Sequence, residues 1–309
     1  MNSNAGKDAR MKPQTPALSI VIASVNGLDL LEKTLNAIDN LAERRQIEVV
    51  VVDRVGQSVR SRLKDRSPNV VVVPVDQKLT IPRLRFLGVG ASNAPIVAFL
   101  EDHVAVEPGW AAAILEAHRN DCGAVGGAVA DGRTDLVSTA AFLCEYHRYM
   151  PPVVEGPCDD LPGNNIAYKR EVIEKYAYLL DNGKWESWIN QELKAEGALT
   201  RSTGRAVVRH IKPFGFMHFL TQRFHFARSF AGMRRDDQSW TRRVVYGLGS
   251  IALPLLFLLR ISRAVIVKRV APGRFLKALP LIVVFVSAGA IGEMIGYIVG
   301  SGTSLERVE

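Results

Sequence analysis

The sequence of 309 residues predicts an α/β domain with a largely parallel sheet, followed by interfacial and membrane-associated helices. Two observations support the α/β domain: short β-branched apolar runs alternate with segments of helical periodicity, and several of those runs end in polar residues. A third supports the membrane region, since two long apolar runs occupy the last quarter of the chain. We therefore expect one globular domain over residues 17–212 and an appendage behind it.

The strand and helix signals alternate along the first two thirds of the chain. The expected strands are residues 17–25, 47–52, 70–75, 96–100, 124–130 and 207–211. The expected helices are residues 28–41, 59–64, 84–91, 167–178 and 188–196. Polar residues follow three of the strands, namely Ser24 and Asn26, then Asp53, then Glu101, Asp102 and His103. Ligands of open parallel sheets bind at the carboxyl ends of the strands, so we expect a binding crevice there.

The formal net charge of +8 is concentrated in one segment. Residues 222–277 contain twelve Lys and Arg and only two acids, Asp236 and Asp237, which is a balance of +10. Because this segment adjoins the long apolar runs, anionic lipid head groups explain its charge better than DNA or RNA. With no nucleic-acid motif in the chain, we expect no nucleic-acid partner.

The N-terminus and the cysteines bear on the compartment. Residues 1–16 are polar and lack the apolar core of a secretory signal, so we expect a disordered lead-in. Cys122, Cys144 and Cys158 are odd in number, and their spacing fits neither a zinc site nor a disulfide framework. Reduced thiols are therefore expected, with the globular domain on the cytoplasmic side of a membrane.

Four sequence blocks carry a resemblance to a known family. They read SIVIASVNGLDLLEKTL, VVVDRVGQS, RFLGVGASNAPIVAFLEDH and WESWINQELKAEG. In this order, and at compatible spacing, they resemble the family 2 glycosyltransferases of GT-A fold over about residues 17–212. The resemblance implies a Rossmann-like domain that binds a nucleotide sugar and transfers the sugar with inversion at its anomeric carbon.

The resemblance places a donor site at the ends of the first two strands. Ser24, Asn26 and Asp53 then lie beside the base and ribose, where a carboxylate accepts hydrogen bonds from hydroxyl groups. Arg85 matches a basic residue near the diphosphate, which a guanidinium suits. The alternatives are a turn cap for Asp53 and an exposed helix arginine for Arg85. Arg54 stands where the family commonly has a second acid.

Glu101, Asp102 and His103 occupy the place of the family's acidic metal-binding triplet. Carboxylates suit a hard divalent ion that bridges the donor pyrophosphate, and the nitrogen of His103 favours Mn²⁺ over Mg²⁺. Such a cation stabilises the charge that develops on the leaving diphosphate. Asp102 is also expected to contact the donor. His210, after the last strand, is a further candidate near the metal or diphosphate, with a structural histidine as the alternative.

The fourth block supplies the expected general base. Glu186 aligns with the second acid of the family's acidic pair, and a single displacement needs a carboxylate to take the acceptor proton. Trp185 and Trp188 are candidates for stacking on sugar faces, with plain packing as the alternative. Asn164 and Asn165 belong to a small-residue loop that the resemblance places beneath the sugar and acceptor, with a simple turn as the alternative.

The C-terminal third changes character. Residues 213–243 interleave phenylalanines with arginines, which predicts interfacial helices, with a solvent-facing helix packed on the core as the alternative. Residues 244–300 are expected to hold one or two membrane crossings, followed by a tail over 301–309. Residues 279–299 contain one charge and are long enough to cross a bilayer core of roughly 30 Å.

The first apolar run, residues 244–261, is shorter and contains Pro254, so crossing, dipping and lying in the interface all remain open. The loop between the two runs is basic and should stay cytoplasmic. A simple hairpin of two crossings conflicts with this rule, because it places the loop on the side opposite the globular domain.

The combined prediction is a membrane-attached, metal-dependent, inverting hexosyltransferase. Its donor is expected to be UDP- or GDP-linked, and its acceptor a lipid-linked or envelope polysaccharide. Two alternatives stand beside this: a polyprenyl-phosphate sugar synthase, whose phosphate acceptor has less need of a base, and a catalytically silent membrane scaffold, suggested by Arg54 and His103.

Overall fold

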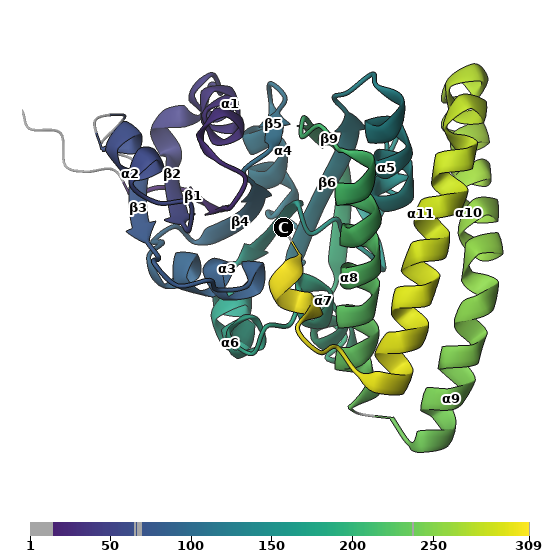
Figure 1. The fold of residues 1–309 in the computed structure, drawn as a ribbon. Coiled ribbons are helices and arrows are strands. Elements are labelled where there is room, and N and C mark those ends of the chain that lie inside the picture. Colours follow the sequence, from purple (N-terminus) through teal and green to yellow (C-terminus); the bar gives the residue numbers. More distant parts are fainter. Residues whose placement is uncertain (1–14, 65, 67–69, 237, 309) are drawn as a thin grey trace, which may run out of the picture.

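A mixed β-sheet forms the centre of the computed structural model, which describes residues 15–64, 66, 70–236 and 238–308 (Figure 1). The predicted lead-in falls almost wholly outside these residues. The strands are β1 Leu18–Ser24, β2 Ile47–Asp53, β3 Val70–Pro74, β4 Ile96–Glu101, β5 Val104–Val106, β6 Ala124–Asp131, β7 Gly156–Pro157, β8 Asn165–Lys169 and β9 Thr200–His210. Their order in the sheet is β3-β2-β1-β4-β8-β6-β9-β5, with β7 on the far side of β9.

The first four strands of that order pair in parallel, as predicted. Ser24 of β1 pairs with Asp53 of β2, and Ala23 pairs with Glu101 of β4. This register brings the three polar strand ends to one edge of the sheet. The second half is mixed, because β8 runs antiparallel to both β4 and β6, whereas β6 and β9 are parallel.

Helices cover both faces of the sheet. They are α1 Leu28–Asp39, α2 Gln57–Leu63, α3 Ile81–Gly90, α4 Trp110–Ala117, α5 Leu136–Tyr146, α6 Arg170–Asp181 and α7 Glu186–Ala195. Alternate residues of β1 enter different cores: Ile20 and Ile22 lie in one hydrophobic cluster and Val21 in the other. The continuous apolar run of β1 therefore reflects a strand buried on two faces.

The helix expected over residues 167–178 is corrected by the structure. Its first residues belong to β8, which is almost completely buried between β4 and β6, and the helix α6 begins only at Arg170. The run Ile166–Tyr168 fails as a helix signal because a short apolar segment has no periodicity that separates a buried strand from a helix start. The sequence prediction also lacked α4 and α5.

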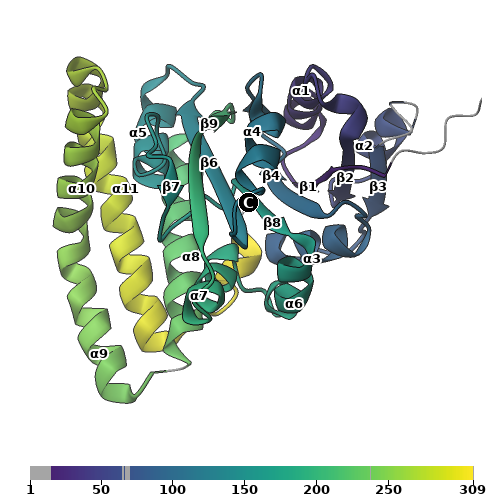
Figure 2. The same cartoon turned by 180° about the vertical axis from the view of Figure 1, so that it is seen from behind.

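Four helices form the C-terminal region: α8 Phe216–Arg235, α9 Trp240–Gly249, α10 Leu253–Val267 and α11 Pro272–Val299. Figures 1 and 2 agree that α11 lies between α8, next to the globular domain, and the outer α9–α10 pair. Two stretches, Trp240–Val267 and Pro272–Val299, are long and apolar enough to cross a membrane by length and composition. They begin four and seven residues before the apolar runs expected from the sequence, which were residues 244–261 and 279–299.

The helices α8 and α11 run in the same direction in close contact. The ring of Phe216 lies 5.6 Å from that of Phe285, and further along, a Cβ atom on Gly292 would lie 2.2 Å from the carbonyl oxygen of Phe224. Phe219 and Phe285 are fully buried in the same cluster as strands β1 and β2. The hydrophobic core therefore continues across residue 212 into the C-terminal helices.

Candidate active site

Asp102 fixes the loop after β1 to the end of β4. Its Oδ2 accepts hydrogen bonds from the backbone amides of Val25 and Asn26, both at 2.7 Å. Its Oδ1 accepts from the side-chain amide of Asn26 at 2.8 Å and lies 2.9 Å from Nδ1 of His103. Burial favours the neutral acid, but the bond and charge of His103 and the backbone bonds from Asn26 and Val25 together outweigh it and lower the pKa of Asp102.

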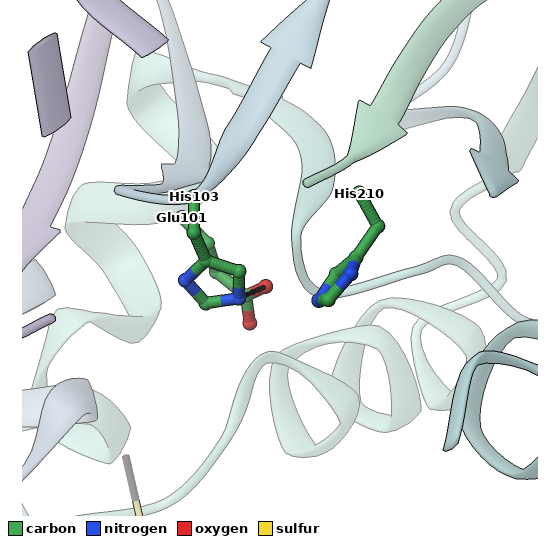
Figure 3. A group of neighbouring side chains, drawn as sticks. All are labelled: Glu101, His103 and His210. Carbon is green, nitrogen blue, oxygen red and sulfur yellow. Dashed lines mark ion pairs between the residues drawn. The ribbon is translucent and has the colours of Figure 1, made fainter. Parts of the chain in front are cut away.

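Glu101, His103 and His210 form a separate group whose ligand atoms all lie within 4.8 Å of one another (Figure 3). Nε2 of His103 lies 3.1 Å from Oε2 of Glu101, and the rings of His103 and His210 are 4.9 Å apart, edge to face. His210, at the end of β9, is 2% exposed, and its Nε2 has no hydrogen-bond partner among the described residues. Two nitrogens and a carboxylate oxygen fit a divalent cation such as Mn²⁺.

Asp102 lies outside this group in the structure, and its expected role as a metal ligand stays a prediction. Both of its oxygens are already occupied by donors from Val25, Asn26 and His103, so their lone pairs face protein groups. His210 takes the third position instead. The triplet is thus divided: Glu101 and His103 group with His210, and Asp102 holds the loop that carries Asn26.

The protonation of the group follows from its carboxylates. Burial opposes a charged imidazole, but Glu101 and Asp102 together raise the pKa of His103 to about 9. Burial also opposes ionisation of Glu101, whereas His103 and Arg85 lower its pKa to about 2. Burial, reinforced by the nearby His103 cation, lowers the pKa of His210 to about 3. His210 is therefore a neutral imidazole ready to ligate, whereas a cation bound at Nε2 of His103 must displace the proton that this nitrogen shares with Glu101.

Arg85 of α3 and Glu186 of α7 form a buried ion pair. Nη1 of Arg85 lies 2.5 Å from Oε1 of Glu186, and the side chains are 2% and 4% exposed. The alternative of an exposed helix arginine is therefore excluded for Arg85. Glu186 is the first residue of α7, where the helix dipole favours a carboxylate. Its other oxygen lies at Gly163, where an added Cβ would come within 3.0 Å.

Members of both polar groups line one cavity of about 550 Å³ between the sheet domain and the C-terminal helices. Glu101 contributes from the metal group, and Arg85 and Glu186 contribute together from the ion pair. Asn164 also lines it, with both side-chain amide atoms buried and without a hydrogen-bond partner among the described residues. The amide of Asn164 is thus available to a ligand.

Tyr146 is a cavity residue that the sequence prediction missed. It lies at the end of α5, lines the cavity and places its hydroxyl 3.5 Å from Oε2 of Glu101. No sequence motif marks Tyr146, and the helix α5 that carries it was not predicted either.

Three predicted site residues have structural partners in the domain. The side chain of Asn165 accepts a bond from Nε1 of Trp110 and donates to two backbone carbonyls. Asp53 accepts from the backbone of the turn after β2 and pairs with Arg60 at 3.0 Å, which fits the alternative of a turn cap. The ring of Trp188 lies 4.5 Å from that of Phe230 at an angle of 54°, and Trp188 does not line the cavity. Their roles toward a donor or sugar stay predictions.

Trp185 and Ser24 differ from these three. Trp185 lines the cavity while its ring lies 5.6 Å from that of Phe226, so its packing and its access to a ligand coexist. Ser24 is fully buried, and its hydroxyl has no hydrogen-bond partner among the described residues.

Comparisons with known proteins identify the family and the fold. Residues 19–177, just over half of the chain, match the model of "Glycosyl transferase family 2". No curated protein matches the sequence. The structure is similar to the mannosyltransferase PcManGT from Pyrobaculum calidifontis in complex with GDP-Man and Mn²⁺, with a TM-score of 0.58 and 17% identity over 91% of this chain and 87% of that one. The chain therefore belongs to the family 2 glycosyltransferases and has their GT-A fold.

Proposed function

We propose that this glycosyltransferase moves a hexose from a GDP- or UDP-linked donor to a membrane acceptor, with inversion and with the aid of a divalent cation. The observation that carries the proposal is the shared cavity, in which the carboxylate of Glu101 and the Arg85–Glu186 pair face the same space. The carboxylate of Glu101, through a bound cation, suits the leaving diphosphate, and the Arg85–Glu186 pair suits the incoming acceptor.

Glu101, His103 and His210 are the residues that would hold the cation. Bound there, a Mn²⁺ or Mg²⁺ ion stabilises the negative charge on the departing nucleoside diphosphate. The structural neighbour named above was solved with GDP-Man and Mn²⁺, which makes GDP-mannose the first donor to test here.

Glu186 is proposed as the general base. The acceptor oxygen forms a bond to the anomeric carbon, the bond from that carbon to the diphosphate oxygen breaks, and the acceptor proton passes to the carboxylate of Glu186. Arg85, 2.5 Å from that carboxylate, restricts its orientation. Because the side chains of this pair are buried, few water molecules reach Glu186. Water therefore competes less with the acceptor for attack on the anomeric carbon.

We also propose that the C-terminal helices attach the enzyme to one face of a membrane without crossing it. The arginines of α8 lie alongside α11: an added Cβ on Gly289 would approach Arg223, and one on Gly296 would meet the carbonyl of Arg228. If α11 crossed a bilayer, α8 and the domain packed on it would reach the same depth, at a large cost for the charged groups.

An in-plane arrangement removes this cost. The outer helices α9 and α10 expose large apolar side chains, with Val245 at 60%, Leu255 at 65% and Ile266 at 76% exposure. This surface suits the acyl boundary of one leaflet, and the basic residues around it suit anionic head groups. The basic loop between α10 and α11 then stays on the side of the domain, which also resolves the conflict with the positive-inside rule.

A donor panel tests the proposed activity. Full-length protein in detergent is incubated with GDP-mannose and UDP-linked hexoses, with Mn²⁺, Mg²⁺ or EDTA, and nucleotide release is measured. We expect release from at least one donor that depends on the cation, and a strong loss in His210→Ala. His118→Ala is the matched control, since His118 is a buried histidine outside the cavity. Release from no donor would favour the silent scaffold.

A further inference from the structure

The wall of the cavity that comes from the C-terminal helices is apolar. It consists of Phe226 and Phe230 of α8, Leu253 and Phe257 of α10, and Val286 and Ala290 of α11. A sugar and a nucleotide are polar and have no need of such a wall. The same helix α10 exposes Leu255 and Leu259 on its outer side, so apolar side chains lie on both the cavity side and the exterior side of this helix.

Arginines interrupt this wall. Of the five that line the cavity, two are already paired: Arg85 with Glu186 at 2.5 Å and Arg148 with Asp160 at 2.6 Å. The other three come from the C-terminal helices, namely Arg223, Arg234 and Arg260.

Arg223 is the cation with the least compensation. It is only 9% exposed, it has no ion pair or hydrogen bond with any residue that the structure describes, and its Nε is buried without a partner. A buried guanidinium without a partner is costly, and it therefore marks a place where an anion is expected to bind.

Two acids of the cavity, Glu145 and Glu293, lie within electrostatic range of Arg223 without contacting it. Glu145 carries only part of a charge near neutral pH, because burial raises its pKa to about 7. The local balance around Arg223 thus stays favourable to an anionic ligand.

We propose that this part of the cavity binds a lipid-linked acceptor through a phosphate group, with the phosphate on Arg223 and the lipid chain along the apolar wall. The inference rests on the proposed transferase function and names its substrate class. The planar guanidinium binds phosphate with two parallel hydrogen bonds. The chain then leaves between α10 and α11 toward the membrane, and the part of the acceptor beyond the phosphate extends toward Glu186.

Binding can be measured without any donor. The full chain in nanodiscs of phosphatidylcholine is titrated calorimetrically with farnesyl phosphate, with farnesol and with inorganic phosphate. We expect farnesyl phosphate to bind at least about tenfold tighter than either of the other two, since only it supplies both the charge and the chain. Equal affinity for farnesol would remove the phosphate from the proposal, and equal affinity for inorganic phosphate would remove the lipid.

Variants localise the phosphate. Arg223→Gln should weaken farnesyl phosphate binding about tenfold or more, and Arg223→Lys should weaken it less because the charge remains. Arg242→Gln is the matched control, since Arg242 is an exposed arginine of α9 outside the cavity. A folded Arg223→Gln protein with unchanged affinity would overturn the assignment. The comparison of the three ligands on the unmodified protein needs no variant to fold.

The outcome is separable from that of the donor panel. Nucleotide release without selective binding of farnesyl phosphate would leave the transferase function standing and overturn the lipid-phosphate site. Selective binding without release from any donor would do the reverse.

Discussion

Replacing Glu186 by Gln removes a proton acceptor and also breaks a buried ion pair, and the structure allows the two effects to be separated. Arg85 and Glu186 are 2% and 4% exposed and 2.5 Å apart, so the variant leaves a buried guanidinium without its counter-ion. Breaking a buried pair costs about 3–5 kcal/mol of stability. We expect the lower end of this range, because Gln keeps the size of the side chain and a polar oxygen facing Arg85.

The catalytic effect is expected on a different quantity. A positioned base contributes about 10²–10⁴ in rate, which is about 3–5 kcal/mol of barrier. Donor affinity should change little, since the acceptor proton is not involved in donor binding. A melting curve of Glu186→Gln gives the temperature below which the variant is folded, and calorimetric donor titration and a transfer assay are then run below it.

Glu192→Gln is the control on the same helix, because Glu192 is an exposed acid of α7 outside the cavity. It should alter neither the melting temperature nor the turnover appreciably. Near-normal turnover of folded Glu186→Gln would refute the base assignment and leave a structural role for the pair. It would also favour an acceptor, such as a phosphate, that needs no base.

Three further predictions concern the C-terminal helices and the cavity. Gly292→Ala should destabilise the protein by about 1–3 kcal/mol in chemical unfolding, because the added Cβ would lie 2.2 Å from a backbone oxygen of α8. Gly249→Ala, in a helix with open space around it, should be neutral or stabilising, and equal effects would contradict the close packing. In sealed vesicles, an impermeant maleimide should label Ala271→Cys and Thr303→Cys, at the two ends of α11, from the same side; labelling from opposite sides would show a crossing. The folded protein retains a proton on Glu145 that the unfolded chain releases, so this residue costs stability as pH rises from about 4.5 to about 7. Glu145→Gln should therefore raise the melting temperature at pH 8 relative to wild type and leave it nearly unchanged at pH 4, and a pH-independent difference would refute this ionisation.

The linear pattern of the chain predicted the elements whose signal is local. The parallel strands β1, β2 and β4 were confirmed because β-branched apolar runs and following polar residues lie within a few positions of each other. The strand β8 was missed because its burial is imposed by two neighbours, β4 and β6, that lie far away in sequence. Local propensity carries no information about such neighbours.

The sequence by itself determined the α/β order, the family and the edge of the sheet where the polar residues gather, since each depends on short-range patterns. The tertiary structure alone decided which of those residues face one another. It turned Asp102 toward Val25 and Asn26 and brought His210 beside Glu101, more than a hundred positions away. It also placed Arg223 in the cavity of Glu186. Packing of the sheet and the helices fixes which face of each element is covered. Only then is it decided which side chains of different elements point toward one another and how far apart they lie.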